Sequence, residues 1–294
     1  MPPAPPQTES GTAAPEQDRS ECPLRFDHVS VLFDGVKALD DISFQMTAGQ
    51  TRVVLGAAGS GKTTLLKAAI GLVRIDSGHI FLCGDDITNV KERQLFSKRA
   101  RVGVLFQEGG LFDSMTVAEN VSYPLLNRQA RQAATADDVA TRVQNVLRFV
   151  ELEQTLDKFP SELSGGMRRR VGIARAVVTE PPLVLYDSPT AGLDPITANT
   201  IMTLIAKERD IRNTANLIVT HRYQDGQLMA NFRYNPQRGQ LEPVAHNGAD
   251  GDRGSQGNTV FMVMNEGKLV FEGTQAELEA SRDEYLSKFV LKRR

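Results

Sequence analysis

The sequence is poor in cysteine, balanced in charge and free of long apolar runs. Its 294 residues include only two cysteines, Cys22 and Cys83, which are too few for a disulfide framework and indicate a reducing compartment. The 34 basic and 36 acidic side chains leave a formal charge of −2, so we expect no nucleic-acid partner. No apolar run approaches the roughly 20 residues that a membrane-spanning helix needs. A role at a membrane would therefore depend on a partner.

The first 22 residues are also poor in apolar side chains. They are rich in Pro, Ala and acidic or polar residues, and we expect 1–22 to be a disordered tail because it cannot bury enough apolar surface. Without an apolar segment near the N-terminus, no signal peptide is expected. The length allows one large domain or two modest ones.

A glycine-rich stretch, GAAGSGKT at 56–63, is the most informative feature of the chain. It follows an apolar run at 51–55 that predicts a buried strand, and it precedes a predicted helix over 64–70. This order matches the phosphate-binding P-loop, GxxxxGK[ST]. A chance match would occur in roughly one chain in a hundred of this length.

The residue types in this loop suit phosphate binding. Gly56, Gly59 and Gly61 allow successive backbone N–H groups to point at an anion, and the helix start adds a partial positive charge. Lys62 can reach the outer phosphates and Thr63 can offer its hydroxyl to Mg²⁺. The P-loop alone leaves kinases, GTPases and many ATPases open.

Strands and helices alternate along most of the chain, which predicts a mostly parallel α/β sheet with ligands at the carboxyl ends of its strands. Helical stretches at 116–123 and 136–150 form a predicted insert, a helical subdomain of about 108–165. The predicted strands are 24–31, 39–46, 51–55, 79–83, 102–106, 183–187 and 216–220, and the other helices are 64–70, 90–100, 163–178 and 196–211.

The last third of the chain departs from this alternation. Residues 232–258 are rich in Gly, Asn, Asp and Gln and predict a mobile surface loop, of no assigned role. Residues 260–264 and 268–271 predict a hairpin. Thr274 and Glu277 form a capping box for a C-terminal helix over 275–294.

A second set of motifs narrows the choice of P-loop family. LSGGM at 163–167, together with Gln107, the strand-end Asp187, GLD at 192–194 and His221, resembles the ATP-binding cassette (ABC) ATPases in motif and order. The resemblance covers about 24–274. It implies a P-loop NTPase domain over 23–274, with a mostly parallel core sheet, an N-terminal antiparallel β subdomain and the helical subdomain.

The resemblance also implies roles for single residues. Phe33 would stack on the adenine of ATP, and His221 would contact the γ-phosphate. Thr63 and Gln107 would reach Mg²⁺, and Asp187 would hold it through water. The residues that would hold the phosphates are Gly59, Ser60, Gly61, Lys62, Thr63 and Thr64.

The LSGGM motif implies a second subunit. Ser164, Gly165 and Gly166 would bind the γ-phosphate of a nucleotide held by another copy, since a helix N-terminus rich in small residues is an anion site. This chain has one P-loop, so we expect a dimer with a second ABC ATPase subunit, a homodimer in the first instance and a heterodimer as the alternative. Asp194 would cross the same interface.

Each residue also has a structural interpretation when considered by itself. Phe33 alone would more often be a core residue, His221 a structural histidine and Gln107 a surface side chain. The arginines at 168–170 are predicted to be a solvated helix face with no catalytic role. The joint order of the motifs favours the functional interpretations.

Ser188 is the main departure from the family pattern. A Glu usually follows the strand-end Asp and activates the attacking water, whereas Ser is a poor base at neutral pH. Loss of a positioned base typically costs about 10²- to 10⁴-fold in rate. We therefore expect weak hydrolysis with His221 as the nearest substitute, or alternatively a nucleotide-gated switch. Met167 stands where Gln is usual.

Three stretches are similar to the ATPases of bacterial Mla/MCE-type lipid transporters: 102–125, 159–176 and 186–198. This resemblance implies an integral membrane permease that docks near 107–123, and a connected MCE lipid-binding protein. It places the chain in the cytoplasm, peripheral on the inner face of the bacterial cell membrane. A soluble DNA-repair or translation ABC protein is a weaker alternative, because the chain has a single cassette, no coiled-coil insertion and near-neutral charge.

Overall fold

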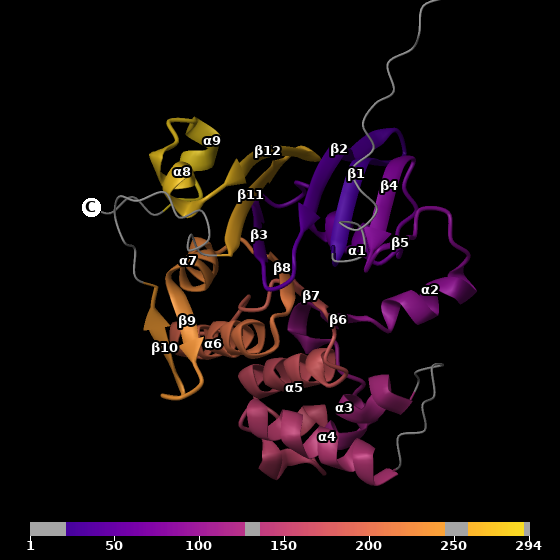
Figure 1. The fold of residues 1–294 in the computed structure, drawn as a ribbon, viewed down its shortest axis with the longest axis vertical. Coiled ribbons are helices and arrows are strands. Elements are labelled where there is room, and N and C mark those ends of the chain that lie inside the picture. The colour runs from indigo at the N-terminus through magenta and orange to yellow at the C-terminus, as the bar shows by residue number, and fades with distance from the viewer. Residues whose placement is uncertain (1–21, 127–135, 245–257, 291–294) are drawn as a thin grey trace, which may run out of the picture.

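The computed structural model describes residues 22–126, 136–244 and 258–290. Within these residues, six strands form the main sheet in the order β12-β11-β3-β8-β7-β6 (Figure 1). All neighbours pair in parallel except β12, which is antiparallel to β11 at the edge. The strands are β3 (Thr51–Gly56), β6 (Val102–Leu105), β7 (Leu183–Asp187), β8 (Ala215–Val219), β11 (Thr259–Asn265) and β12 (Lys268–Gly273).

A second, antiparallel sheet lies above α1 and the main sheet in the order β2-β1-β4-β5 (Figure 1). Its inward side chains and those of α1 share one core with the near face of the main sheet, in which Phe26 and Phe44 stack at 4.8 Å. The predicted antiparallel subdomain is therefore confirmed. Its elements are β1 (Leu24–Phe33), β2 (Val36–Met46), β4 (Ser77–Leu82) and β5 (Asp85–Asp86), with α1 at Lys62–Ala69.

The opposite face of the main sheet is covered by helices in two groups. Apolar cores lie between these helices and the sheet, so β3 is covered on both faces. It is therefore buried along its whole length, as the apolar run at 51–55 predicts. One group is α5 (Gly165–Val177) and α6 (Pro195–Arg212); the other is α7 (Tyr223–Asn231), α8 (Gln275–Ala280) and α9 (Glu284–Ser287).

The predicted helical insert packs against α5 at the far end of the molecule from the antiparallel sheet (Figure 1). It contains α3 (Val117–Leu126), α4 (Ala136–Phe149) and three short 3₁₀ turns, η2 (Gln107–Gly109), η3 (Glu153–Thr155) and η4 (Pro160–Glu162). In α4 the predicted apolar stripe faces inward through Val143, Val146 and Leu147. Helix α2 (Glu92–Arg99) joins the antiparallel sheet to β6.

Two predictions for the last third of the chain are wrong in part. Residues 232–243, assigned to a surface loop, form a hairpin of β9 (Phe232–Asn235) and β10 (Gln240–Pro243). It is held by α6, since the Tyr234 N–H donates to Asp210 at 2.7 Å. The rest of the predicted loop, 245–257, lies outside the described residues.

The C-terminal helix is also not continuous. It divides into α8 and α9, because Asp283 caps a new helix by accepting hydrogen bonds from the N–H groups of Tyr285 (2.8 Å) and Leu286 (2.9 Å). The predicted capping box at the start of α8 is present, with Glu277 N–H donating to the Thr274 hydroxyl at 3.2 Å. Residues 1–21 and 291–294 lie outside the described chain.

Candidate active site

The loop between β3 and α1 folds around its own lysine. Lys62 begins α1, and its Nζ donates to the carbonyl oxygens of Gly56 (2.9 Å) and Ala57 (2.7 Å) and to Ser60 Oγ (3.2 Å). Burial lowers the pKa of Lys62, and the charge of Asp187 partly offsets this effect. An incoming phosphate would offer the ammonium a charged partner in place of neutral carbonyls.

Two glycines allow the tight course of this loop. A Cβ on Gly61, whose φ is +101°, would collide with the carbonyl oxygen of Ala38 on β2. A Cβ on Gly56 would lie 2.6 Å from the carbonyl oxygen of Met264 on β11. The loop is therefore confined between the two sheets at these two positions.

Four of the predicted site residues lie at the same edge of the main sheet as this loop. Gln107 begins η2 after β6, Asp187 ends β7, Ser188 follows it, and His221 comes two residues after β8. Because β6, β7, β8 and β3 run in parallel, their carboxyl ends meet at one edge, where the P-loop begins. The structure thus brings the phosphate-binding and catalytic candidates together.

Ser188 lies in a left-handed backbone conformation with φ +50°. Its N–H donates to the carbonyl of Val219 at 2.8 Å, and its hydroxyl donates to Asp187 Oδ1 at 3.2 Å. The hydroxyl is thus bound to the neighbouring carboxylate, and Ser188 itself supplies no group that can take a proton from water at neutral pH.

Arg169 contradicts the prediction of a solvated arginine face. Its side chain is buried, and it donates to the carbonyls of Ser188 (2.9 Å) and Ala191 (3.1 Å). Its neighbours Arg168 and Arg170 are half-buried and also donate to backbone carbonyls. Three consecutive residues of a helix cannot share one face, so at least one had to turn inward.

A buried aspartate joins the two segments that follow β7 and β8. Asp225 on α7 accepts hydrogen bonds at one oxygen, Oδ2, from the hydroxyls of Thr190 (2.6 Å) and Thr220 (2.7 Å). Burial raises the pKa of Asp225, and the two hydroxyls partly offset this. Since Thr190 follows Ser188 and Thr220 precedes His221, this carboxyl links both catalytic candidates.

The segment that carries Gln107 is held by a second buried arginine. Arg175 of α5 donates to the carbonyls of Gly109 (3.0 Å) and Gly110 (2.8 Å), and burial lowers its pKa. Sequence reasoning missed Arg169, Arg175 and Asp225. For Arg169 the sequence did contain a signal. Gly172, Ile173 and Ala176 follow it by three, four and seven residues, which places Arg169 on the same apolar or small stripe of the helix.

Phe33 lies at the end of β1, opposite Val36 at the turn into β2, and it is 49% exposed. Its interpretation as a core residue is therefore excluded. The same hairpin passes against the P-loop at Ala38, whose carbonyl faces Gly61. The ring is thus free to contact a flat ligand.

The LSGGM motif lies at the start of α5, beside the start of α6. Ser164 caps α5 by accepting from the Met167 N–H at 3.2 Å, and Asp194 caps α6 by accepting from the N–H groups of Ile196 and Thr197, both at 3.0 Å. Hydrogen bonds from Thr197 and Ile196 lower the pKa of Asp194. Two helix N-termini therefore meet at one surface.

A cavity of about 560 Å³ opens between these two helix starts. No P-loop residue lines it, so within one chain the structure does not bring Ser164, Gly165, Gly166 and Asp194 to the Lys62 site. Its lining is Glu151, Ser164, Gly165, Gly166, Met167, Arg170, Gly192, Leu193, Asp194, Ile196, Thr197, Thr200 and Ile201.

Residues 39–191 match the family model described as ABC transporter. The matched segment contains the P-loop, Gln107, the LSGGM motif and Asp187. The chain belongs to the ABC transporter family. It has the P-loop α/β fold of that family, as the sequence predicts.

The curated relatives of this member of the ABC transporter family have different names. It is 38% identical over 189 residues to a probable ribonucleotide transport ATP-binding protein, mkl, of Mycobacterium leprae, covering 64% of this chain and 54% of the relative. It is 38% identical over 187 residues to the methionine import ATP-binding protein MetN of Carboxydothermus hydrogenoformans, covering 63% and 54%. The chain spans about half the length of these relatives.

A solved structure has the same fold over most of the molecule. CbiO1 of Clostridium perfringens, described as part of the ABC transporter complex cbiONQ, superposes with a TM-score of 0.72 at 26% identity, covering 89% of this chain and 92% of that one. The names of the two curated relatives both describe ATP-binding proteins of transport, but they differ in what is transported.

The oxygen donors at the P-loop edge suit a magnesium ion that arrives with a nucleotide. Asp187 carries a carboxylate, Thr63 a hydroxyl and Gln107 an amide oxygen, all of which are hard donors that Mg²⁺ accepts. Among the described residues, no cluster of three His, Cys, Asp or Glu side chains could hold a metal by itself. Mg²⁺ commonly takes one or two protein ligands and completes its shell with phosphate and water, so the residues fit.

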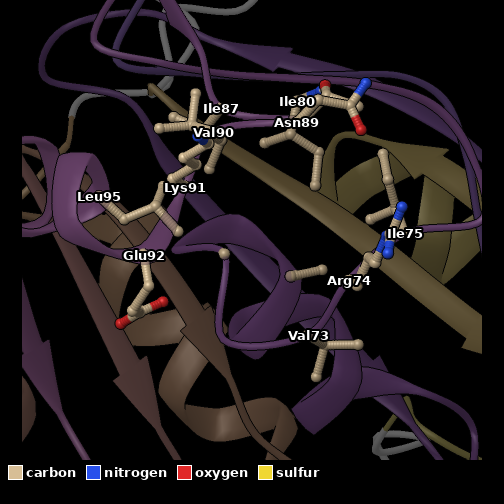
Figure 2. A pocket seen from close by; sticks show the side chains of 13 residues that line it. Val73, Arg74, Ile75, Ile80, Ile87, Asn89, Val90, Lys91, Glu92 and Leu95 are labelled. Atoms are coloured by element: carbon tan, nitrogen blue, oxygen red, sulfur yellow. The ribbon is translucent and has the colours of Figure 1, made fainter.

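A second cavity of this chain, about 350 Å³, lies between the end of α1 and α2 (Figure 2). Figure 2 shows apolar side chains such as Ile87, Val90 and Leu95 on one side and Val73 and Ile75 on another. It contains none of the nucleotide-site candidates, so we assign it no role in ATP binding.

In the described ranges, no helix is long and apolar enough to cross a bilayer.

Proposed function

We propose that this chain is the ATP-binding and ATP-hydrolysing subunit of an ABC transporter, acting as a dimer on a separate membrane permease. The observation that carries the proposal is the separation of the Lys62 site from the Ser164 cavity within one chain. Two helix N-termini converge on that cavity, and such ends favour an anion. A second copy can supply the anion as the γ-phosphate of its own nucleotide.

The surface around this cavity supports pairing of two copies. Ile196 is 80% exposed beside Asp194 in the lining of this cavity, so pairing of two copies here would remove its apolar side chain from water. Facing copies would place Ser164, Gly165 and Gly166 of one subunit opposite the P-loop of the other. ATP would then be sandwiched twice, and both sites would form only in the closed homodimer.

The chemistry at each site follows from residues at the P-loop edge of the main sheet, together with Phe33 at the end of β1. Phe33 stacks on adenine, and the N–H groups from Gly59 to Thr64 bind the phosphates. Lys62 leaves the carbonyls of Gly56 and Ala57 for the phosphates. Bound Mg²⁺, held by Thr63, Gln107 and Asp187, would offset phosphate charge. His221 reaches the γ-phosphate from the end of β8.

Ser188 favours a second candidate function, a nucleotide-gated switch with little hydrolysis. Its hydroxyl donates to Asp187 and it has no basic group, so deprotonation of water there must come from elsewhere. In this alternative ATP closes the dimer and dissociation of the nucleotide reopens it.

One experiment separates the two functions. ATP hydrolysis is measured with the full chain in complex with its permease, for wild type, Lys62→Ala, Ser188→Glu and Ser188→Ala. A transport motor requires turnover in wild type and Ser188→Ala, and its loss in Lys62→Ala. A switch requires wild type to be as inactive as Lys62→Ala, while Ser188→Glu gains about 10²-fold or more. If ATP neither bound to the wild-type chain nor caused it to dimerise, both candidate functions would be excluded.

The permease is expected to dock beside Gln107. Phe106 is 45% exposed, Phe112 41% and Tyr123 39%, and the last two rings lie 4.9 Å apart. Phe112 and Tyr123 lie within the predicted docking segment 107–123, and the exposed ring of Phe106 directly precedes it. Through such contacts the chain would be held at the cytoplasmic face of the membrane.

The transported molecule is proposed to be a lipid, because segments 102–125, 159–176 and 186–198 resemble the ATPases of Mla/MCE-type lipid transporters. The same resemblance would add an MCE lipid-binding protein as a partner. The names of the relatives point instead to methionine or ribonucleotides. Mass spectrometry of lipids that co-purify with the permease complex, and stimulation of ATPase activity by phospholipid against methionine, distinguish these substrates. Stimulation by methionine alone would exclude the lipid assignment.

A further inference from the structure

The C-terminal helix α9 reaches the P-loop through one hydroxyl. Tyr285 Oη donates to the carbonyl of Met264 at 2.9 Å and accepts from the N–H of Ala57 at 3.3 Å. Met264 lies near the end of β11, in register with Gly56 of β3. A residue 228 positions further along the chain thus contacts the second residue of the phosphate-binding loop.

The contact falls on the peptide unit that Lys62 also holds. The carbonyl oxygen of Gly56 accepts from Lys62 Nζ at 2.9 Å, and the N–H of the same peptide unit, that of Ala57, donates to Tyr285. When Lys62 turns to a phosphate, the carbonyl loses this partner. The tyrosine hydroxyl then remains as the side-chain contact that keeps this peptide plane in place.

The loop has little else of its own to fix this plane. Gly56, Ala57, Ala58 and Gly59 have no side chain beyond Cβ, and glycine permits rotation of the adjoining peptide units at low cost. Ala57 and Ala58 are exposed, so packing does not hold them. A contact from outside the loop can therefore add to the support of this exposed part of the P-loop.

Helix α9 is held in place by packing against the main sheet, so it can give that support. Leu286 is buried against the apolar side chains of β3 and β11, and Tyr285 packs edge-on against Phe289 with ring centroids 5.1 Å apart. Helix α8 is tied to the same face, because the hydroxyl of Tyr223 on α7 donates to Glu279 at 2.7 Å.

We propose that Tyr285 is a positioning residue of the ATP site, through which the C-terminal segment 274–290 sets the nucleotide affinity of the P-loop. The proposal rests on nucleotide binding by the P-loop, as proposed above. Tyr285 does not touch ATP; it holds the Gly56–Ala57 peptide plane from which the phosphate-binding part of the loop continues. Displacement of α9 would weaken binding without altering any residue that contacts ATP.

Tyr285→Phe tests this, since it removes only the hydroxyl and keeps the ring against Phe289. Tyr223→Phe is the matched control, because it removes the hydroxyl that ties α8 to α7 and leaves the P-loop untouched. The full chain is titrated with ATP, and amide hydrogen exchange is followed in the peptide covering 55–62. Unfolding in urea is recorded for each variant.

Tyr285→Phe is expected to raise the Kd for ATP about three- to tenfold, the equivalent of one hydrogen bond, and to speed exchange in 55–62. Tyr223→Phe should change neither quantity, even if it lowers stability. Equal affinity and exchange in Tyr285→Phe and wild type would overturn the proposal, as would equal effects of both variants. Failure of wild type to bind ATP, with Lys62→Ala indistinguishable from it, would instead refute nucleotide binding itself.

Discussion

The guanidinium of Arg169 donates a 2.9 Å hydrogen bond to the backbone carbonyl of Ser188. Arg169 lies on α5 in the turn that follows Ser164, and Arg175 of the same helix holds the segment that carries Gln107. One rigid helix therefore connects the surface that would face a second subunit with two loops of the proposed nucleotide site of its own chain. Movement of α5 on dimer closure would be transmitted to both.

Arg169→Lys tests this connection. A lysine keeps the charge but lacks the planar fork that reaches two carbonyls, so Ser188 or Ala191 loses its donor. We expect the free energy of unfolding to fall by about 1–3 kcal/mol. The misplaced loop should lower kcat about three- to tenfold, whereas the Kd for ATP should stay unchanged because the P-loop is intact.

The same substitution one residue earlier is the control. Arg168 is half-buried and donates to the carbonyl of Leu163, away from Ser188. Arg168→Lys should leave kcat close to wild type. A loss of kcat of the same size in both variants would show that α5 acts only through general stability.

The pattern of the sequence predicted the main sheet, the P-loop and the strand-end position of Asp187, because each depends on local periodicity and motif spacing. It failed where a distant contact decides the outcome. The polar segment 232–243 becomes a hairpin because Asp210 of α6 binds its backbone. Arg169 turns inward because two carbonyls of the loop after β7 accept its hydrogen bonds. Tyr285 reaches the P-loop only through the pairing of β11 with β3, which no local pattern encodes.

Asp225 should make stability depend on pH in a defined direction. Burial raises the pKa of Asp225 above its ordinary value of 3.8, so the folded state binds this proton more tightly than the unfolded chain. Its contribution therefore favours folding at low pH and is lost as pH rises from about 3.8 through the raised folded pKa. Above that value the cost of the buried charge is constant.

Asp225→Asn should remove this dependence. The amide oxygen can still accept from the hydroxyls of Thr190 and Thr220, which both use one oxygen in the native chain. The difference in unfolding free energy between variant and wild type, measured in urea from about pH 4 to pH 8, should shift in favour of the variant as pH rises. A difference that is flat across this range would contradict the expectation.

Phe33 should contribute to affinity for the base and not for the phosphates. Stacking of a base on an aromatic ring is worth about 1–3 kcal/mol, so Phe33→Ala should raise the Kd for ATP about fivefold or more, while Phe33→Tyr should bind as wild type. Tripolyphosphate, which lacks the base, should bind all three alike. Leu32→Ala is the control, because the preceding strand residue points to the other face. Equal weakening for tripolyphosphate and ATP would exclude stacking.

The glycines of the P-loop should differ in their tolerance of alanine. Gly59 has φ +76° with open space where a Cβ would lie, so Gly59→Ala carries only the left-handed backbone cost of about 1–2 kcal/mol. Gly61 has φ +101°, and its Cβ would also collide with the Ala38 carbonyl, which belongs to the backbone of β2 and cannot rotate away. Gly61→Ala should therefore lower the free energy of unfolding more than Gly59→Ala and abolish ATP binding, because β2 and the start of α1 must separate. Urea unfolding and ATP titration of the two variants check this order, and equal losses would mean that the P-loop is not confined between the sheets in solution.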